Sequence, residues 1–191
     1  MTDRDTEIDL AVLHQAIVDD IKAQFPDLVT VEFYRGQDTG EDRRNLPTPA
    51  CLLDLTELEA GPEADPGTEQ LAVLAKFEAA LVIDFRTAQS KLSIRQLAAS
   101  FAAWLRLRRW SNAAVPGKKL PTGPAQVVGA YPDDFQPDLE RFVVWRVEWQ
   151  QIIHLGQTVW KPEGAAPTQV LVSFTPDIGF GHEPDYVPVT P

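Results

Sequence analysis

The sequence of 191 residues is poor in the residue types that build most catalytic and metal sites. It contains one cysteine, Cys51, and three histidines, His14, His154 and His182. A single cysteine excludes an intramolecular disulfide and leaves too few thiolates for a cysteine-based zinc site. The histidines lie far apart in the sequence and form no H-E-x-x-H pair. We therefore interpret Cys51 as a small buried strand residue and the histidines as unrelated structural side chains.

The motifs of phosphate-binding and nucleophilic sites are also missing. The chain has no G-x-x-x-x-G-K-S/T, no G-x-G-x-x-G after a strand and no G-x-S-x-G. No apolar run approaches the ~20 residues that a membrane-spanning helix needs. The first ten residues are acidic and polar, unlike a signal peptide. We expect a protein without catalytic activity, cofactor, metal or membrane contact, in the cytoplasm or assembled there.

Positive charge is scarce relative to negative charge. Lys and Arg number 17 against 28 Asp and Glu, which gives a net charge of −11 and a pI near 4.6. This balance argues against a protein that binds duplex DNA by neutralising phosphates, or that docks on anionic lipid. Acid is concentrated in one loop, 59–70, which has no basic residue. Its acidic residues are Glu59, Glu63, Asp65 and Glu69.

Proline, in contrast, is abundant, with 16 residues where about 10 are expected at a share near 5%. Six of them lie in the last 36 residues. We predict a domain over 1–156 and a Pro-rich C-terminal arm over 157–191. The arm is either an extended segment that orders on a partner or a solvated, disordered tail. The residues expected to make its contacts are Trp160, Val170, Val172, Phe174 and Tyr186.

Apolar periodicity predicts two helices and five strands. The helices cover 8–25 and 93–110, and the strands cover 28–35, 48–58, 71–87, 125–131 and 141–155. The predicted fold is α+β. It has a mainly antiparallel sheet of about five strands, two helices on one face, a long projecting β-hairpin and an extended C-terminal arm. The hairpin pairs 48–58 with 71–87, and its tip is expected to extend beyond the domain.

Several local features follow from these patterns. Thr6 or Asp9 is positioned to cap the first helix. Ser93 and Gln96 fit a capping box for the second helix. We attribute the cluster Arg106, Arg108 and Arg109 to the dipole of that helix rather than to nucleic acid. At the ends of the strands, the alternation places Val29, Leu71 and Phe85 on the buried face.

The strand 141–155 has two chemically different faces. Trp145 and Trp149 belong to its apolar face, which we expect the helices to cover. The opposite face carries Arg146, Glu148, Gln150 and His154. This charged face is either solvated or a contact between subunits.

Three sequence patterns together resemble the tail terminator proteins (minor tail or head–tail completion proteins) of long-tailed bacteriophages. The first is an opening helix, LAVLHQAIVDDIKAQFPD, that leads into the strand VTVEFYRG. The second is the strand AKFEAALVIDFR, which runs directly into LSIRQLAASFAAWLRLRRW. The third is the closing segment GAYPDDFQPDLERFVVWRVEWQQIIHLG, with its W-x-V-x-W-x-Q pattern. The resemblance covers residues 8–156.

The resemblance implies a virion structural protein of the tail–neck region that is assembled in the host cytoplasm. Family members form a ring, usually a hexamer, on the tail tube. The ring stops tube polymerisation and joins the tail to the head connector, and DNA passes through its lumen without specific binding. The implied partners are further copies of the chain, the tail tube protein and the head–tail connector or stopper protein. Members are typically shorter than this chain, so the arm departs from the family pattern.

Under this interpretation, the candidate functional residues line a subunit interface or the channel. They are Glu59, Glu63, Asp65, Glu69, Lys76, Glu78, Asp84, Arg146, Glu148 and Gln150. Two alternatives remain from the sequence. One is another neck, stopper or baseplate ring component of a phage particle. The other is a small acidic protein that inhibits a host nucleic-acid enzyme.

Overall fold

The computed structural model describes residues 8–35, 46–61, 67, 69–133, 142–156, 159, 171–176 and 178–188. The chain divides into two compact units. The larger is Asp5–Trp160, and the smaller combines Met1–Arg4 with Lys161–Pro191.

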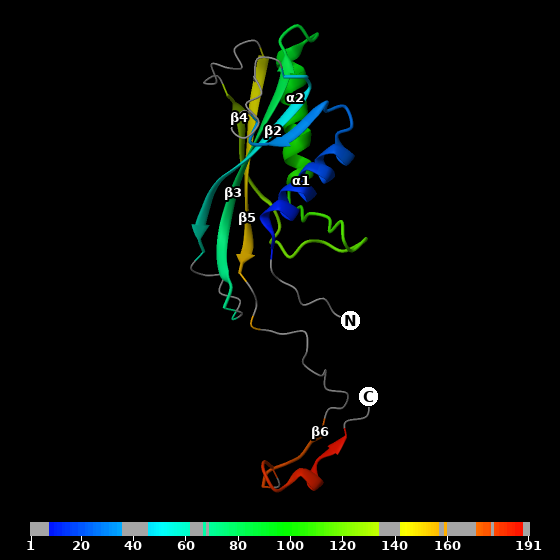
Figure 1. The fold of residues 1–191 in the computed structure, drawn as a ribbon, viewed down its shortest axis with the longest axis vertical. Coiled ribbons are helices and arrows are strands. Elements are labelled where there is room, and N and C mark those ends of the chain that lie inside the picture. Colours follow the sequence, from blue (N-terminus) through cyan, green and yellow to red (C-terminus); the bar gives the residue numbers. More distant parts are fainter. Residues whose placement is uncertain are drawn as a thin grey trace. The chain divides into compact units, whose positions relative to one another are not determined.

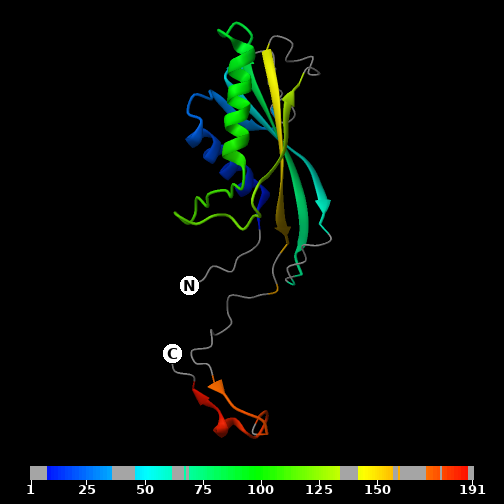
Figure 2. The ribbon, with the colours of Figure 1, turned by 180° about the vertical axis from the view of Figure 1, so that it is seen from behind.

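The larger unit is an α+β fold with two helices and a mixed five-stranded sheet. Its elements are α1 (Leu10–Gln24), β1 (Thr30–Phe33), β2 (Ala50–Ala60), β3 (Leu71–Asp84), α2 (Ser90–Leu105), β4 (Gln126–Pro132) and β5 (Phe142–Leu155). The strand order is β1-β2-β3-β5-β4, with β1 parallel to β2 and the other neighbours antiparallel. Both helices lie on the same side of the sheet (Figures 1 and 2).

The first helix begins where its sequence predicts. The Asp9 side chain accepts a hydrogen bond from the backbone N–H of Ala11 at 2.7 Å, which confirms the predicted cap. Its buried side chains recur at three- and four-residue steps and face the sheet. They are Leu13, Ala16, Ile17, Val18 and Ile21.

The second helix differs from its prediction at both ends. It begins at Ser90 after Gln89, which has a left-handed backbone and makes no side-chain capping bond, so the predicted capping box is wrong. It ends at Leu105 with no basic residue in its last turn, so the dipole explanation for the arginines is wrong. Arg108 lies beyond the helix and stacks over the Trp104 ring at 4.1 Å. Arg108 therefore packs on the aromatic ring through a cation–π contact, which an interaction with the helix dipole does not predict.

The predicted hairpin does not project as an isolated pair of strands. β3 pairs with β5 along its whole length, from Leu71 opposite Leu155 to Asp84 opposite Phe142. The two strands share an apolar alternation, so pairing them buries one continuous face. At its centre the rings of Phe77 and Trp149 stack with centroids 5.2 Å apart. The β2–β3 hairpin is therefore part of a longer three-stranded ribbon, formed by β2, β3 and β5.

The apolar alternation overestimates burial at the strand ends. Val29, Leu71 and Phe85 are exposed by 62%, 57% and 55%, although each was expected on the buried face. Val29 precedes β1 and Phe85 follows β3. The alternation continues past the last position that the helices cover. Further inside the sheet the prediction holds, and Cys51 is fully buried.

A buried glutamine, Gln151, connects the core to the segment that follows α2. Its carboxamide oxygen accepts the indole N–H of Trp110 at 2.7 Å and that of Trp149 at 3.3 Å. Its amide nitrogen donates to the carbonyls of Gly123 at 2.9 Å and Arg108 at 3.4 Å. Gln151 is only 1% exposed, so all four bonds are made away from solvent. Gln151 is the glutamine of the W-x-V-x-W-x-Q pattern, which by itself predicts no role for this side chain.

Gly123 is required for that connection because the backbone approaches β5 closely. Its N–H donates to the carbonyl of Ile152 at 2.7 Å. A Cβ at this position would lie 3.3 Å from the backbone and the Cβ of Ile152. This spacing is tighter than most Cβ contacts, so a side chain here would require the segment or Ile152 to shift by a few tenths of an ångström.

The described part of the smaller unit is not extended throughout, contrary to the predicted arm. β6 (Leu171–Val172) pairs with β7 (Val187–Pro188) in an antiparallel ladder, and a short 3₁₀ helix covers Glu183–Asp185. The chain folds back because Gly179 and Gly181 adopt φ angles of 90° and 96°, which suit turns. Phe180, between them, is completely exposed.

We predict that Gln151→Leu destabilises the larger unit by about 3 kcal/mol, because two buried indole N–H groups lose their acceptor. Urea denaturation followed by tryptophan fluorescence measures the change. The control is Gln150→Leu, the neighbouring residue on the opposite face, whose exposed amide donates to the Gln126 side chain at 3.3 Å. That variant should stay within about 0.5 kcal/mol of wild type. Equal losses in the two variants would contradict the role of Gln151.

Candidate functional site

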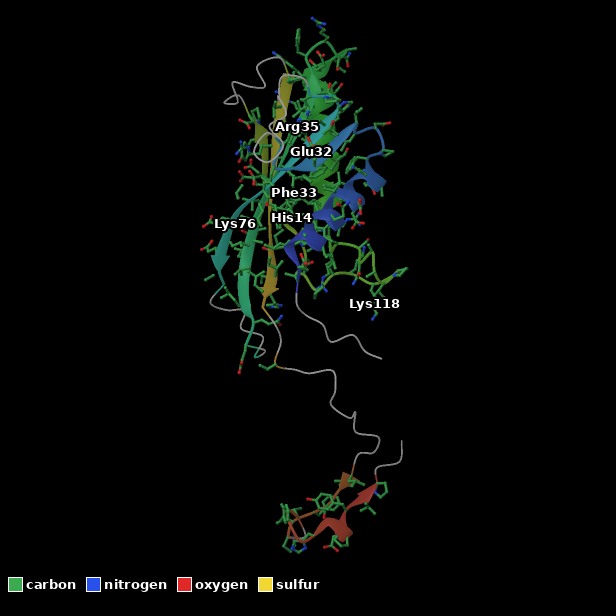
Figure 3. All side chains as sticks on the ribbon, in the orientation of Figure 1. His14, Glu32, Phe33, Arg35, Lys76 and Lys118 are labelled. Atoms are coloured by element: carbon green, nitrogen blue, oxygen red, sulfur yellow. The ribbon has the colours of Figure 1, made fainter. Side chains whose placement is uncertain are left out.

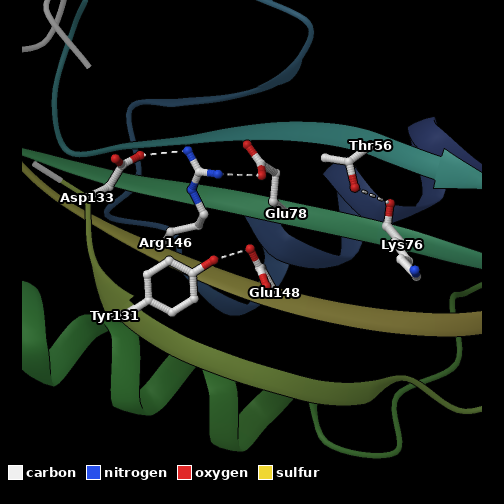
Figure 4. A network of polar contacts seen from close by, with 7 residues as sticks. All are labelled: Thr56, Lys76, Glu78, Tyr131, Asp133, Arg146 and Glu148. Carbon is white, nitrogen blue, oxygen red and sulfur yellow. Dashed lines mark hydrogen bonds and ion pairs between the residues drawn. The ribbon is translucent and has the colours of Figure 1, made fainter. Parts of the chain in front are cut away.

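The candidate site is the outer face of the sheet, opposite the helices. Toward one end this face holds a small apolar cluster formed by Leu46, Ala50, Leu52, Ala80, Val82 and Val144. Beyond the cluster, the strands present charged side chains that interact across the sheet (Figure 4). We call these residues the outer-face network. They are Asp54, Glu57, Glu59, Lys76, Glu78, Tyr131, Asp133, Arg146 and Glu148.

Arg146 is the centre of this network. Its Nη1 lies 2.8 Å from the Glu78 carboxylate and its Nη2 lies 2.8 Å from that of Asp133 (Figure 4). The Asp133 side chain is only 6% exposed, so this ion pair lies largely away from solvent. Burial lowers the pKa of Arg146, but the bond to Asp133 and the charge of Glu78 outweigh it and raise the pKa overall. The guanidinium is therefore fully charged.

Strand register brings three carboxylates side by side. Asp54 lies directly opposite Glu78, and Glu78 lies directly opposite Glu148. Like charges at such positions repel one another. Burial raises the pKa of Glu78, Arg146 lowers it, and the charges of Asp54, Glu148 and Asp133 raise it further. The net effect is a raised pKa of Glu78, with burial as its largest cause.

The neighbouring strand contributes a phenol to the same row. The Tyr131 hydroxyl donates a hydrogen bond to the Glu148 carboxylate (Figure 4). Burial and this bond raise the pKa of Tyr131 to about 12. The phenol therefore stays protonated as a donor and does not act as a base near neutral pH.

Further along the ribbon, Lys76 lies between two carboxylates of β2. Its Nζ is 2.9 Å from Glu57 and 2.7 Å from Glu59. Hydrogen bonds to Glu59 and then Glu57 raise the pKa of Lys76. A bulge at Thr56 shifts the register of β2 here, and the Thr56 hydroxyl donates to the Lys76 carbonyl at 3.2 Å (Figure 4). The bulge brings both glutamates to the same lysine.

The structure brings together six of the ten predicted interface residues. Glu59, Lys76, Glu78, Arg146, Glu148 and Gln150 share the outer face. Asp84 lies at the far end of β3, where it accepts the backbone N–H of Arg86 at 2.8 Å. Glu69 is exposed before β3. Glu63 and Asp65 lie outside the described residues.

The predicted arm residues belong to the smaller unit or fall outside the description. Val172 lies in β6, and Phe174 is 76% exposed. The Tyr186 hydroxyl accepts the N–H of Gly179 at 3.1 Å. Trp160 and Val170 lie outside the described residues.

Sequence reasoning missed Asp54, Glu57, Tyr131 and Asp133 as members of the network. Glu57 was assigned to the predicted strand without a role, although its spacing from Glu59 indicates a shared face. Tyr131 and Asp133 are twenty or fewer residues from Arg146, but only the pairing of β4 with β5 brings them next to it. No local pattern encodes that register.

His14 lies in a separate cleft of about 710 Å³ between α1 and β1. Its Nδ1 contacts the Leu10 carbonyl, which can only accept, so Nδ1 carries the proton. In the neutral ring Nε2 then accepts the Tyr34 hydroxyl, 2.7 Å away. The ring also packs on Phe33, with centroids 4.0 Å apart (Figure 3). These contacts hold His14 in place on the helix.

Cys51 faces the main core. Complete burial raises the pKa of its thiol far above the usual range, so the reactive thiolate does not form. Within the described ranges, no three His, Cys, Asp or Glu side chains are grouped to hold a metal ion. The helices in those ranges include none that is long and apolar enough to cross a membrane.

Comparisons with known proteins give little further information. No family model and no curated protein matches the chain. A solved structure whose name states no function matches with a TM-score of 0.41 and 13% sequence identity. The match covers 81% of this chain and 95% of that one. A likeness at this level carries no argument about function.

We predict that Glu78 makes the stability of the protein fall as pH rises. Its pKa in the folded state lies above the ordinary value of 4.5, so the folded state binds this proton more tightly than the unfolded state. The free energy of unfolding should therefore decrease from about pH 4.5 upward until the carboxyl is fully ionised. Glu78→Gln should remove this decrease while keeping an acceptor for Arg146. Urea denaturation of both proteins between pH 4.5 and neutrality measures the difference.

The control is Glu57→Gln, a more exposed carboxylate of the same network. It should leave the pH dependence of wild type in place. A difference between wild type and Glu78→Gln that grows in favour of wild type with rising pH would show that Arg146 dominates, and would contradict the prediction.

Proposed function

We propose that this chain is a virion structural protein of the tail terminator type. In this proposal, copies form a ring, expected to be a hexamer, that caps the tail tube and stops its polymerisation. The ring then joins the tail to the head connector and lets DNA pass. The chain would act in the neck region of the particle, without catalysis or a cofactor.

The observation that carries the proposal is the way the three resembling patterns fold together. The opening pattern forms α1 and β1, and the second forms β3 and α2. The third forms β4 and β5. All of these elements belong to one packed unit, in which the helices and the sheet share a single main core. The sequence patterns are therefore parts of one fold, which supports reading them as one resemblance.

The electrostatics of the outer face are compatible with this role. Its carboxylates outnumber its cations, Lys76 and Arg146, and both cations are already paired. Such a surface does not bind DNA phosphates. A channel through which the genome passes must not bind them either, because binding would slow the DNA. The network residues, with the acidic loop 59–69, remain the candidates for a subunit interface or a channel wall.

We predict that the purified chain assembles into a closed ring. In a phage that lacks this protein, we expect tail length to be no longer fixed. Sedimentation and negative-stain electron microscopy of the full chain measure the assembly. A phage with the gene disrupted should produce tails of irregular length that lack heads, and complementation should restore joined particles. A chain that remains monomeric at all concentrations and is absent from purified particles would refute the proposal.

A further inference from the structure

One segment of this acidic chain carries positive charge and no negative charge. Between Phe85 and Pro132 there are eight Lys or Arg and no Asp or Glu. All 28 acidic residues therefore lie elsewhere in the chain. In three dimensions the segment comprises α2, the stretch that follows it, and β4. Its cations are Arg86, Lys91, Arg95, Arg106, Arg108, Arg109, Lys118 and Lys119, which we call the cationic surface.

These eight cations make no salt bridge with any residue that the structure describes. All but Arg108 are exposed. Where their side chains make contacts, the partners are neutral: Arg95 lies over Trp145 at 5.2 Å, and Lys119 donates to the Ser111 hydroxyl at 2.9 Å. On the outer face, in contrast, both Lys76 and Arg146 have two carboxylate partners each. The two surfaces therefore differ in the sign of their charge and also in whether their cations form ion pairs with described residues.

Exposed apolar side chains accompany the cationic surface. Leu92 in α2 is 51% exposed, and Leu107 is 58% exposed. Leu107 has a φ of 60°, and its N–H bonds to the Ala125 carbonyl at 2.9 Å. A left-handed backbone is unfavourable for a leucine. The hydrogen bond to Ala125 stabilises it here, in a conformation that leaves the Leu107 side chain exposed to solvent. Apolar groups within a charged border are typical of protein interfaces.

The cationic surface and the outer-face network belong to opposite layers of the unit. α2 packs on the inner face of the sheet, against β3, β4 and β5. The network projects from the other face of the same sheet. Figure 3 shows this separation at its two labelled lysines, with Lys118 on the helix side and Lys76 across the sheet. One copy therefore presents the cationic surface on the helix side and, on the other side, a network in which six carboxylates surround two cations. The helix side also carries Asp19 and Asp20 of α1, and Asp20 accepts the N–H of Ser111 at 2.9 Å.

We propose that the cationic surface of one copy binds the outer-face network of a second copy. The contact joins two different surfaces, so it is head-to-tail, and repeating it gives a ring when the rotation closes. Complementary charge gives this contact its direction, because two like faces repel. This inference rests on the proposed ring and names the surfaces that build it.

The observations favour a second copy over nucleic acid as the occupant. The net charge of −11 makes the chain as a whole repel DNA at long range. The aromatic rings near the cations are already covered, Trp104 by Arg108 and Trp145 by Arg95, so they offer no free platform for bases. A second copy always brings a complementary acidic face in equal number.

The test uses two charge-reversal variants of the full chain. Lys91→Glu with Arg106→Glu reverses two exposed cations that make no side-chain contact among the described residues. Glu57→Lys with Glu59→Lys reverses two glutamates whose side chains are 55% and 53% exposed. Lys22→Glu, an exposed cation on α1 outside the cationic surface, is the control. Thermal unfolding verifies that each variant is folded, and sedimentation measures assembly.

Each double variant alone should assemble about 100-fold more weakly than wild type, because an attraction becomes a repulsion. An equimolar mixture of the two should regain assembly, since the reversed faces now complement each other. Lys22→Glu should assemble like wild type. Raising the salt concentration should weaken wild-type assembly and the mixture alike.

The remaining outcomes separate this inference from the proposed function. If wild type never assembles, the ring itself fails. If wild type forms rings and both double variants do so equally well, the ring stands and the surfaces assigned here are wrong. If Lys91→Glu with Arg106→Glu keeps assembly but loses fluorescence-detected binding to a DNA duplex, the cationic surface serves nucleic acid and the inference is overturned. Loss of assembly in both variants without recovery in the mixture also overturns it.

Discussion

The arrangement of the larger unit depends on the acceptors found by two buried indole N–H groups. Trp110 and Trp149 are both almost completely inaccessible, and both donate to the same Gln151 oxygen. An amide oxygen has two lone pairs, so one side chain satisfies both rings. The amide nitrogen then fixes the carbonyls of Arg108 and Gly123, on either side of the loop after α2. A polar group inside an apolar core thus determines where a surface segment lies.

That constraint links the core to the segregation of charge. The loop held by Gln151 carries five of the eight cations of the segment. Its position beside α2 joins these cations to those of the helix on the same layer. On the other layer, β2, β3 and β5 place their acids in adjacent register positions around Arg146. The same sheet therefore separates the two charges, and its long β3–β5 pairing fixes the separation.

Much of this fold follows from periodicity, and much of the site does not. The alternation in 71–87 and 141–155 predicts β3, β5 and the buried Phe77 and Trp149, because alternate residues of a strand face one layer. Periodicity places Arg146, Glu78 and Lys76 on the exposed face but gives no partners, since partners depend on strand register. Gln151 stands in the W-x-V-x-W-x-Q pattern, but a polar residue in an apolar row predicts no partner by itself. Its function appears only when Trp110, 41 residues away, packs beside it.

Placing cations and carboxylates on different surfaces affects the stability of a single chain less than it affects the association of two chains. An exposed ion pair within a monomer contributes about 0–1 kcal/mol, so leaving the cationic surface without carboxylate partners costs the single chain little. The network shows the opposite arrangement, where the Asp133 side chain is 6% exposed and forms an ion pair with Arg146. Its exposed glutamates remain available to a second copy. Where many exposed charges meet a complementary face, they steer the encounter and fix the register of the two copies. A chain built in this way is only weakly stabilised by its surface charge, but it gains a direction of association.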